Sequence, residues 1–405
     1  MKSKFAWALG ATAALAACAT SPSGPIATHP GQLAQPTQPP AVSFALQPAR
    51  FSDLPGWASA DLAPALTAFK RSCDGRALRS SDAPLSTTAR YGGSSGQWTS
   101  ACAAAATTPA GGERAFFEAN FDVFSVRGDN GEARLTAYFE PVIQARRAPE
   151  PGFTEPLLRK PNDMISVDVA GFAEALDDDT LRGAPRRLTG QLVGQTVEPY
   201  PKRQSIAPQP GQVIAYANPV DVYNLQVQGS GRLGFPDGTQ ERAAFAAQNG
   251  YRWSSAIAAM SSSGALQGGA TWPNFRAWAA ANGDAAAHNA LNTDPSYVFF
   301  NEEQIADPAA GPRGAAGVAL TPMGSVAVDP SYHPYGAVVY VDGTYNGQSF
   351  DRLLVAQDTG GAIKRGPLRG DVFMGSGDNA GAAAQTMNSP GARWWTLLPK
   401  GVPVA

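Results

Sequence analysis

Cysteine, histidine and charged residues are all scarce in this 405-residue chain, and each shortage excludes a class of chemistry. There are three cysteines and three histidines, and no two histidines lie close together in the sequence. A structural zinc ion is usually held by about four Cys and His ligands, so we expect no metal site. A Ser-His-Asp triad would need His288 or His333 as its base, and we do not expect one.

The charge is both low and nearly balanced. Charged residues make up 16% of the chain and the net charge is −2, so no strong field steers nucleic acid toward it. After the first residues, no apolar run approaches the roughly 20 residues of a transmembrane helix. The segment "QGSGRLG" lacks the strand-to-helix layout of a dinucleotide site. We therefore expect neither a nucleic-acid partner nor a cofactor.

The chain begins with the layout of a secretory signal. "MKSKFAWALGATAALAAC" contains two lysines, an apolar stretch and then small residues. It ends in Leu15-Ala16-Ala17-Cys18, which resembles a bacterial lipobox, in which the cysteine is lipidated and becomes the first mature residue. The alternative is an ordinary signal peptide with an incidental cysteine. Because Ala19 and not Asp follows Cys18, the lipoprotein interpretation predicts a lipid anchor in the outer membrane of a Gram-negative cell.

Two cysteines remain once Cys18 is set aside. They are Cys73 and Cys102. Exported proteins experience oxidising conditions in which cysteines pair, so we favour a disulfide between them. The alternative is a pair of reduced, buried thiols.

Composition divides the rest of the chain. Residues from 19 to about 45 are rich in Pro, Ser, Thr and Gln, which predicts a flexible tether, with folded structure beginning near Phe51. The 43 glycines and 34 prolines favour turns and short strands. Residues 221–245 are interpreted as a hairpin-like unit, and short strands dominate the last hundred residues. Many short strands with Gly and Pro turns indicate a mainly β fold, either a barrel or a sandwich.

One strand is expected to carry a polar face. In "RLTAYFE" (134–140), alternation places Thr136, Tyr138 and Glu140 on one face and apolar residues on the other. This pattern fits a strand that lines a cleft, and it also fits an ordinary sheet that faces solvent.

Three aspartates follow strand-like runs in the last domain. They are Asp329, Asp358 and Asp371. Burial raises the pKa of a carboxyl group, a nearby carboxylate raises it further, and a nearby Arg or Lys such as Arg369 lowers it. A general acid near neutral pH needs the raised case. The sequence leaves open which influence wins, and also whether the three are merely turn or cap residues.

Five segments, taken together, resemble the membrane-bound lytic transglycosylase A (MltA) family. They are "LTAYFEP" (135–141), "VQGSGRL" (227–233), "YVFFN" (297–301), "GVALTPMGSVAVDP" (317–330) and "VAQDTGGAIKRGPLRGDVFMGSG" (355–377). The last matches the three-aspartate (3D) domain of wall-remodelling proteins. The resemblance implies a double-psi β-barrel domain built from both ends of the chain, with an inserted second β-rich domain and a groove between them.

The signal and the tether, together with the resemblance for the folded part, set the expected boundaries. These are a lipoprotein signal at 1–18, a tether at 19–47, a first barrel part with helices at 48–141, an inserted domain at 142–297 and a second barrel part at 298–405.

The resemblance implies an enzyme, a lyase of peptidoglycan. The family cleaves the β-1,4 bond between N-acetylmuramic acid and N-acetylglucosamine and forms a 1,6-anhydro end. One aspartate serves as acid and then base; it corresponds to Asp371, with Asp358 raising its pKa and orienting it. Candidates for substrate contact follow from the matching motifs: Thr136, Tyr138, Gln228, Ser230, Asp329 and Lys364. This chain has Lys-Arg-Gly at 364–366, where the family has Lys-Gly.

Two alternatives stay open. One is an inverting glycoside hydrolase in which Asp371 is the acid and Asp358 or Asp329 is the base that activates water. The other is a lipoprotein that binds peptidoglycan without cleaving it. In every case the expected partner is a peptidoglycan glycan strand, the expected location is the periplasmic face of the outer membrane, and the expected state is a monomer.

Overall fold

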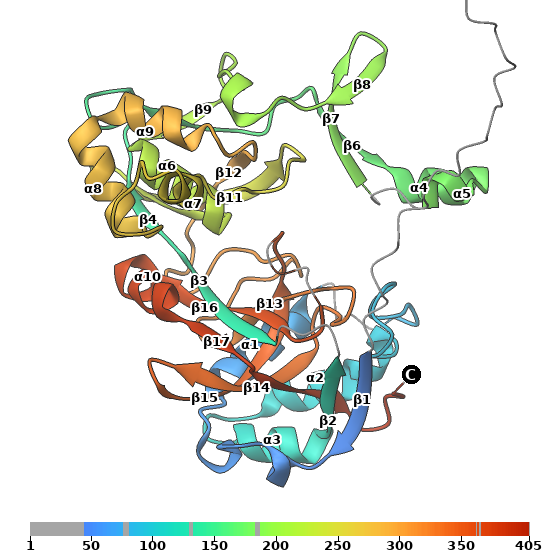
Figure 1. Ribbon diagram of the computed structural model, residues 1–405. Helices are drawn as coiled ribbons and strands as arrows, with labels where there is room; N and C mark the ends of the chain where they lie inside the picture. Colours follow the sequence, from blue (N-terminus) through green and yellow to red (C-terminus); the bar gives the residue numbers. More distant parts are fainter. Residues whose placement is uncertain are drawn as a thin grey trace, which may run out of the picture. The chain divides into compact units, whose positions relative to one another are not determined.

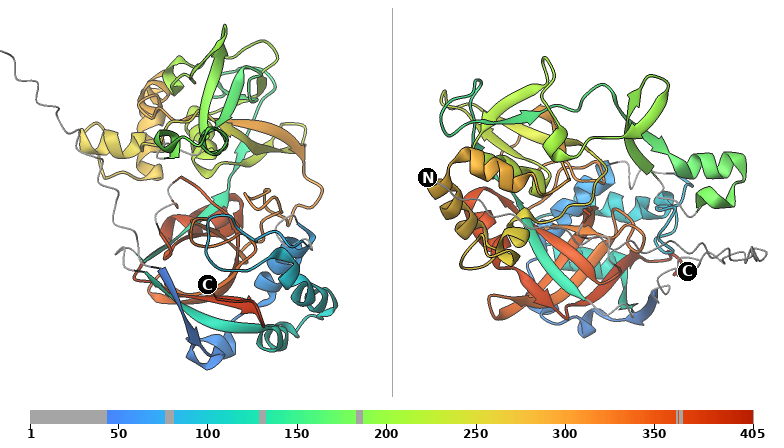
Figure 2. Two further views of the ribbon diagram at one scale, coloured as in Figure 1. Left: turned by 90° about the vertical axis from the view of Figure 1, so that its right-hand side faces the viewer. Right: turned by 45° about the horizontal axis from the view of Figure 1, so that its top comes forward.

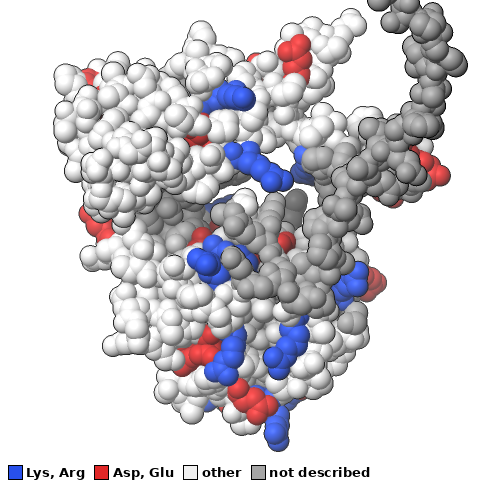
Figure 3. Space-filling view, in the orientation of Figure 1, with Lys and Arg blue, Asp and Glu red and all other residues white. Residues whose placement is uncertain are grey.

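The computed structural model describes residues 44–75, 81–128, 133–182, 187–361, 363 and 366–404. Within them lie two β-rich parts, each with its own helices (Figure 1). Among the described helices, none combines the length and the apolar character that crossing a bilayer requires. Charged side chains of both signs are scattered thinly over the face in Figure 3, as the composition predicts.

The first part is a nine-stranded sheet to which both ends of the chain contribute. Its strand order is β1-β2-β18-β14-β15-β13-β16-β3-β17. The early strands are β1 (Phe44–Ala49), β2 (Phe121–Gly128) and β3 (Arg134–Glu140). The late strands are β13 (Ser325–Val328), β14 (Val338–Tyr345), β15 (Gln348–Asp358), β16 (Arg369–Ser376), β17 (Asn388–Pro390) and β18 (Arg393–Pro399). Two neighbouring pairs, β13–β15 and β16–β3, are parallel.

The core of this part follows from continuous apolar runs. Residues 338–341 of β14 and 353–356 of β15 are buried without alternation, which is the pattern of strands covered on both faces. The helices of this part are α1 (Ala63–Asp74), α2 (Thr99–Thr107), α3 (Glu113–Asn120) and α10 (Gly377–Thr386). A disulfide joins Cys73 of α1 to Cys102 of α2, which confirms the predicted pairing.

The second part holds three smaller sheets (Figure 2). The four-stranded sheet has the order β12-β11-β10-β4, and the others are β5-β9 and β6-β7-β8. The strands are β4 (Val142–Gln144), β5 (Glu155–Leu158), β6 (Met164–Asp168), β7 (Arg187–Val193), β8 (Thr196–Pro199), β9 (Val213–Ala217), β10 (Gly231–Gly234), β11 (Gln240–Gln248) and β12 (Val298–Gln304).

Helices make up much of this second part, so the whole fold is mixed α/β and not mainly β. They are α4 (Val169–Leu176), α5 (Asp179–Arg182), α6 (Pro219–Gln228), α7 (Ala256–Ser262), α8 (Trp272–Asn282) and α9 (Asp284–Leu291). The hairpin expected at 221–245 is wrong in its first half, which is α6. Asn218 caps this helix by accepting from the Val220 amide, and Pro219 fits the first turn.

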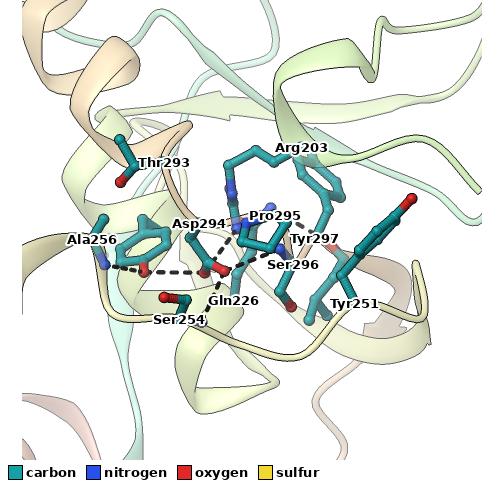
Figure 4. A network of polar contacts seen from close by, with 12 residues as sticks. Arg203, Gln226, Tyr251, Ser254, Ala256, Thr293, Asp294, Pro295, Ser296 and Tyr297 are labelled. Carbon is teal, nitrogen blue, oxygen red and sulfur yellow. Dashed lines mark hydrogen bonds and ion pairs between the residues drawn. The ribbon is translucent and has the colours of Figure 1, made fainter. Parts of the chain in front are cut away.

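A buried polar network fixes the loop before β12 (Figure 4). The Asp294 carboxylate accepts from the Tyr223 hydroxyl and from the amides of Ser254 and Ser296. Arg203 donates to Gln226 at 2.5 Å and lies over the Tyr223 ring. These contacts link α6 to the segment that leads into the edge strand β12. They also satisfy the oxygens of Asp294, without which a buried carboxylate would not be stable.

Two expected boundaries need correction. β1 begins at Phe44, inside the predicted tether at 19–47, because its backbone pairs with β2 from Phe44↔Gly128 onward. β12 pairs with β11 from Val298 to Gln304, so the second part extends beyond the predicted end at 297. Cys18 and the tether residues 19–43 lie outside the described residues.

Candidate active site

Strand register brings Asp358 and Asp371 to either side of one alanine. Asp358, at the end of β15, pairs with Ala327 of β13, and Asp371 of β16 pairs with the same Ala327 from the other side. Residues paired across neighbouring strands point to the same face of a sheet. The β13–β15 register shifts at Ala327, but Thr136 and Tyr138, which alternate on β3, reach Asp371 and Asp358 respectively. The two carboxyl groups therefore share a face, on either side of β13.

The Thr136 hydroxyl holds one oxygen of Asp371. Thr136 of β3 pairs with Asp371 and donates to its Oδ1 at 2.5 Å. The same hydroxyl accepts from a guanidinium nitrogen of Arg369 at 2.9 Å. Among the described residues, no hydrogen bond engages Oδ2 of Asp371, so that oxygen is available to a bound molecule.

Burial raises the pKa of Asp371 and outweighs the opposing influences. The Thr136 hydrogen bond and the Arg369 charge lower this pKa, and the charge of Asp358 raises it. The predicted influence of Asp358 thus has the expected direction, but it is smaller than burial. The half-buried Asp371 side chain retains its proton to higher pH than an exposed aspartate.

Both oxygens of Asp358 already have donors. Oδ2 accepts from the Tyr138 hydroxyl at 2.7 Å, and Oδ1 accepts from the Ala315 amide at 3.0 Å. Burial raises the pKa of Asp358, and these hydrogen bonds lower it in part. Burial also raises the pKa of Tyr138 well above its usual value, so this phenol remains a donor. These two hydrogen bonds fix the orientation of the Asp358 carboxyl group.

Thr136 and Tyr138 act on the aspartates because they alternate on β3, as the sequence predicted. The third residue of that face, Glu140, is fully buried. Its oxygens accept from Arg232 at 2.8 Å, Arg242 at 2.6 Å and Ser376 at 2.6 Å. Since Ser376 ends β16, this ion cluster joins the strand of Asp371 to β10 and β11 of the second part.

The remaining predicted residues lie in different surroundings. Asp329 is buried and accepts from the amides of Ser331 and Gly366 at 3.0 and 3.1 Å, which fixes the two loops. Gln228 accepts from the Phe139 amide at 3.3 Å. Ser230 is buried directly before β10 and, in the described part, does not join the network around the aspartates. Lys364 lies outside the described residues.

The described histidines are not placed to serve as catalytic bases. His333 is buried, with Nδ1 2.6 Å from the Tyr91 hydroxyl and Nε2 2.7 Å from the Pro367 carbonyl. Burial lowers the pKa of His333. The exposed His288 pairs with Glu155 at 2.7 Å in the second part.

Glycine at two positions allows close packing around the site. A Cβ on Gly370 would lie 2.4 Å from the Trp394 ring, so the space beside Asp371 is filled by an indole. A Cβ on Gly314 would lie 2.5 Å from the Gln357 carbonyl oxygen, and this contact brings the Ala315 amide to Asp358. Glycine is required at both positions because any side chain would displace these groups.

Two members of the site were missed from the sequence. Besides the Ala315 amide, Tyr335 lies near Asp358, whose charge, together with burial, raises the tyrosine pKa to about 12. A backbone donor has no signature in a sequence. Tyr335 stands in the Tyr-His-Pro-Tyr segment (332–335) before β14, where only its position beside "GAVVYV" could have drawn attention.

Comparison with known proteins identifies the family of this chain. The family model described as "MltA specific insert domain" matches residues 134–301, and the "3D domain" model matches residues 324–397. A lytic transglycosylase of Burkholderia pseudomallei, LtgG, is 31% identical, with 88% of this chain and 96% of that chain covered and a TM-score of 0.58. The chain belongs to the MltA family.

Other MltA-family relatives extend the comparison. The structure of the membrane-bound lytic murein transglycosylase from Agrobacterium tumefaciens is 29% identical, with 88% of this chain and 98% of that chain covered and a TM-score of 0.72. Membrane-bound lytic murein transglycosylase A of Vibrio cholerae is 31% identical over 276 residues, which span 65% of each chain. The match to the structures thus extends further than the match to the Vibrio sequence.

Proposed function

We propose that this protein is a lytic transglycosylase of peptidoglycan that uses Asp371 as general acid and then general base. Its relatives in the MltA family are named for this activity. The observation that carries the proposal is the state of Asp371: half-buried, with a raised pKa, one oxygen held by Thr136 and the other available. A carboxyl group that keeps its proton toward neutral pH is suited to protonate a leaving group.

The proposed reaction returns Asp371 to its protonated state. Asp371 gives its proton to the glycosidic oxygen as the bond from that oxygen to C1 of N-acetylmuramic acid breaks. Positive charge develops at C1. The O6 hydroxyl of the same sugar then bonds to C1, and its proton passes to the ionised Asp371. Because O6 is tethered to the reacting ring, its effective concentration is high, and neither water nor a protein nucleophile is required.

Asp358 is proposed as a positioning residue. An inverting hydrolase needs a second carboxylate that acts as a base and activates water. Both oxygens of Asp358 accept from fixed donors, Tyr138 and Ala315, and both oxygens of Asp329 accept from loop amides. These contacts orient both carboxyl groups toward protein donors, which supports a positioning role for Asp358, and product analysis separates the lyase from the hydrolase.

The candidates for sugar contact differ in which of their polar atoms already form hydrogen bonds within the protein. The hydroxyls of Thr136 and Tyr138 are committed to the aspartates, so their proposed role is orientation. Gln228 uses only its carbonyl oxygen on the Phe139 amide, and its amide nitrogen can donate to a glycan. Lys364 and Ser230 remain candidates on the strength of their motifs.

We also propose that the nine-stranded sheet closes as a double-psi barrel. The support is the pair of parallel neighbours, β13–β15 and β16–β3. The edge strand β17 also returns to β14, where Ser389 accepts from the Thr344 amide at 2.8 Å. For location, the relatives are named membrane-bound, and we propose that a lipid on Cys18 holds this chain at the outer membrane, facing the periplasm.

The test is product analysis of purified sacculi. Wild-type protein should release muropeptides that lack one water relative to reducing ends, detected by mass spectrometry. Asp371→Asn should release no fragments while still sedimenting with sacculi. The matched control is Asp378→Asn, at an exposed aspartate in the first turn of α10, which should keep full activity. Reducing ends would identify a hydrolase, and binding without release by the wild type would identify a binding protein.

A further inference from the structure

The three-stranded sheet β6-β7-β8 has one wholly uncharged, almost entirely apolar face. Cross-strand pairing aligns Val167 with Leu188 and Leu192 with Val197. Since alternate residues of a strand share a face, the register defines one set, which we call the apolar face. Its members are Ile165, Val167, Leu188, Gly190, Leu192, Val197 and Pro199.

This face is turned away from the rest of the second part. The opposite face contains Met164, which is buried in a cluster with Leu158 and Phe299. It also contains Thr189, which lies close to Gly250: a Cβ on Gly250 would be 3.2 Å from the Thr189 Cβ. An antiparallel sheet normally buries its apolar face and exposes its polar one. Here the polar face is largely exposed, as at Asp168, Arg187 and Glu198, and much of the apolar face is exposed as well. Burial within the fold therefore does not account for the apolar face.

The exposure is large and concentrated. Leu188 is 48% exposed, Leu192 55% and Val197 50%. Of the nine exposed large apolar side chains in the described residues, six lie between 172 and 197. Two of them, Phe172 and Leu176, stand one turn apart on α4, which contacts β7 (Figure 1). Val193 lies on the opposite face of the hairpin, and Leu188, Leu192 and Val197 lie together on the apolar face. Exposed apolar side chains gathered in this way mark a site of interaction.

We propose that the apolar face rests on a lipid bilayer, as a second contact beside the lipid on Cys18. The inference rests on the proposed membrane location and not on the proposed reaction. Residues 188–197 contain no charged side chain, and they form a hairpin with Leu192, Val193 and Val197 around its turn. Apolar side chains at such a tip enter the interface between headgroups and acyl chains, where charges are costly.

Chain length makes the two contacts compatible. Twenty-five residues, 19–43, separate Cys18 from the start of β1 at Phe44. A chain of that length spans at most about 80–90 Å, which exceeds the size of a small domain. An anchor at Cys18 therefore keeps the apolar face at a high local concentration near the surface, where weak individual binding is sufficient.

The test separates the apolar face from the anchor. The chain from residue 18 onward with Cys18→Ser, which lacks both the acylation site and the apolar signal segment, is floated with vesicles of phosphatidylethanolamine and a minor fraction of phosphatidylglycerol. Adding Leu192→Gln with Val197→Gln should lower vesicle partitioning about tenfold or more. The control, Gln191→Ser with Glu198→Gln, changes the neighbouring cross-strand pair on the opposite face and should partition like its parent.

A second measurement reports the depth of insertion. Leu192→Cys in the Cys18→Ser chain provides a single free thiol, since Cys73 and Cys102 are paired. An environment-sensitive dye on it should brighten with vesicles and be quenched by brominated lipids. Unchanged activity on sacculi shows that each variant is folded. A Cys18→Ser chain that does not bind vesicles, or partitioning that survives the double substitution, would overturn the proposal. A concentration-dependent dimer that the double substitution abolishes would also overturn the proposal, because a second copy of the chain would then cover the apolar face.

Discussion

Replacing Thr136 by valine isolates the hydrogen bond that serves Asp371 in its ionised state. Valine keeps the shape of threonine and loses the hydroxyl that donates to Oδ1 of Asp371 and accepts from Arg369. In the proposed reaction Asp371 begins protonated and becomes a carboxylate near the transition state. The hydroxyl thus contributes more to the transition state than to the bound substrate.

The expected loss follows from two kinds of hydrogen bond. A neutral hydrogen bond contributes about 0.5–1.5 kcal/mol, and one to a charged group about 1.5–3 kcal/mol. The difference, roughly 1–1.5 kcal/mol, corresponds to about a 5- to 13-fold fall in kcat, since about 1.36 kcal/mol is a factor of ten. The Thr136 bond lowers the pKa of Asp371, so its removal raises that pKa and moves the alkaline limb of the pH profile upward.

The assay is release of anhydro-muropeptides from sacculi across pH, analysed for kcat and KM separately. Thr136→Ser is the matched control, since it restores the hydroxyl and removes only a methyl group; it should recover most of kcat and the wild-type pH limb. A rise in KM alone would instead make Thr136 a sugar contact. Wild-type kcat and pH dependence in Thr136→Val, or serine as impaired as valine, would refute the reasoning.

Three further predictions concern stability. Burial raises the pKa of Asp371, so its carboxylate costs folding free energy at neutral pH; Asp371→Asn should therefore raise Tm at pH 7, with the gain vanishing below pH of about 4, where the unfolded aspartate is protonated too. Reducing Cys73–Cys102, 29 residues apart, should lower the free energy of unfolding by about 3–4 kcal/mol in denaturant titrations. Glu140→Gln leaves two buried arginines short of charge and should cost about 3–5 kcal/mol by thermal unfolding.

Each stability prediction has its own control. For the aspartate, Asp378→Asn at an exposed position should show no pH-dependent gain, and an equal gain there would contradict the burial argument. For the disulfide, reductant should leave the free energy of unfolding unchanged in a chain with both cysteines replaced by serine. For Glu140, a variant as stable as the wild type would mean that the ion cluster contributes nothing to the fold.

Sequence patterns predicted the shared face of Thr136 and Tyr138 on β3 better than they predicted the helices of the second part. Period-2 alternation put Thr136 and Tyr138 on one face of a strand, and both do contact aspartates. Motif resemblance identified the MltA family, and the family models confirm it. The helical content of the second part was underestimated, because "DVYNLQVQ" alternates enough to resemble a strand while its cap, Asn218, starts a helix.

The predicted domain boundaries were wrong where strand pairing, and not composition, determines the end of a domain. Phe44–Ala49 has a tether-like composition, but it becomes β1 because β2 offers a partner strand. In the same way, β12 continues past residue 297 because β11 continues beside it. Strand pairing is a long-range contact, and the local sequence carries little information about it.

By itself, the sequence determined which residues this protein has for chemistry: few histidines and cysteines, and aspartates at the ends of strands. Only the tertiary structure decided what each aspartate does. Register placed Asp358 and Asp371 beside one Ala327, loop packing brought the Ala315 amide to Asp358, and burial raised the pKa of Asp371 against the charge of Arg369. The reason is that a pKa depends on the groups around a carboxyl in space. Two of those groups, Thr136 and Tyr138, lie more than two hundred residues away in the chain from the aspartates that they contact.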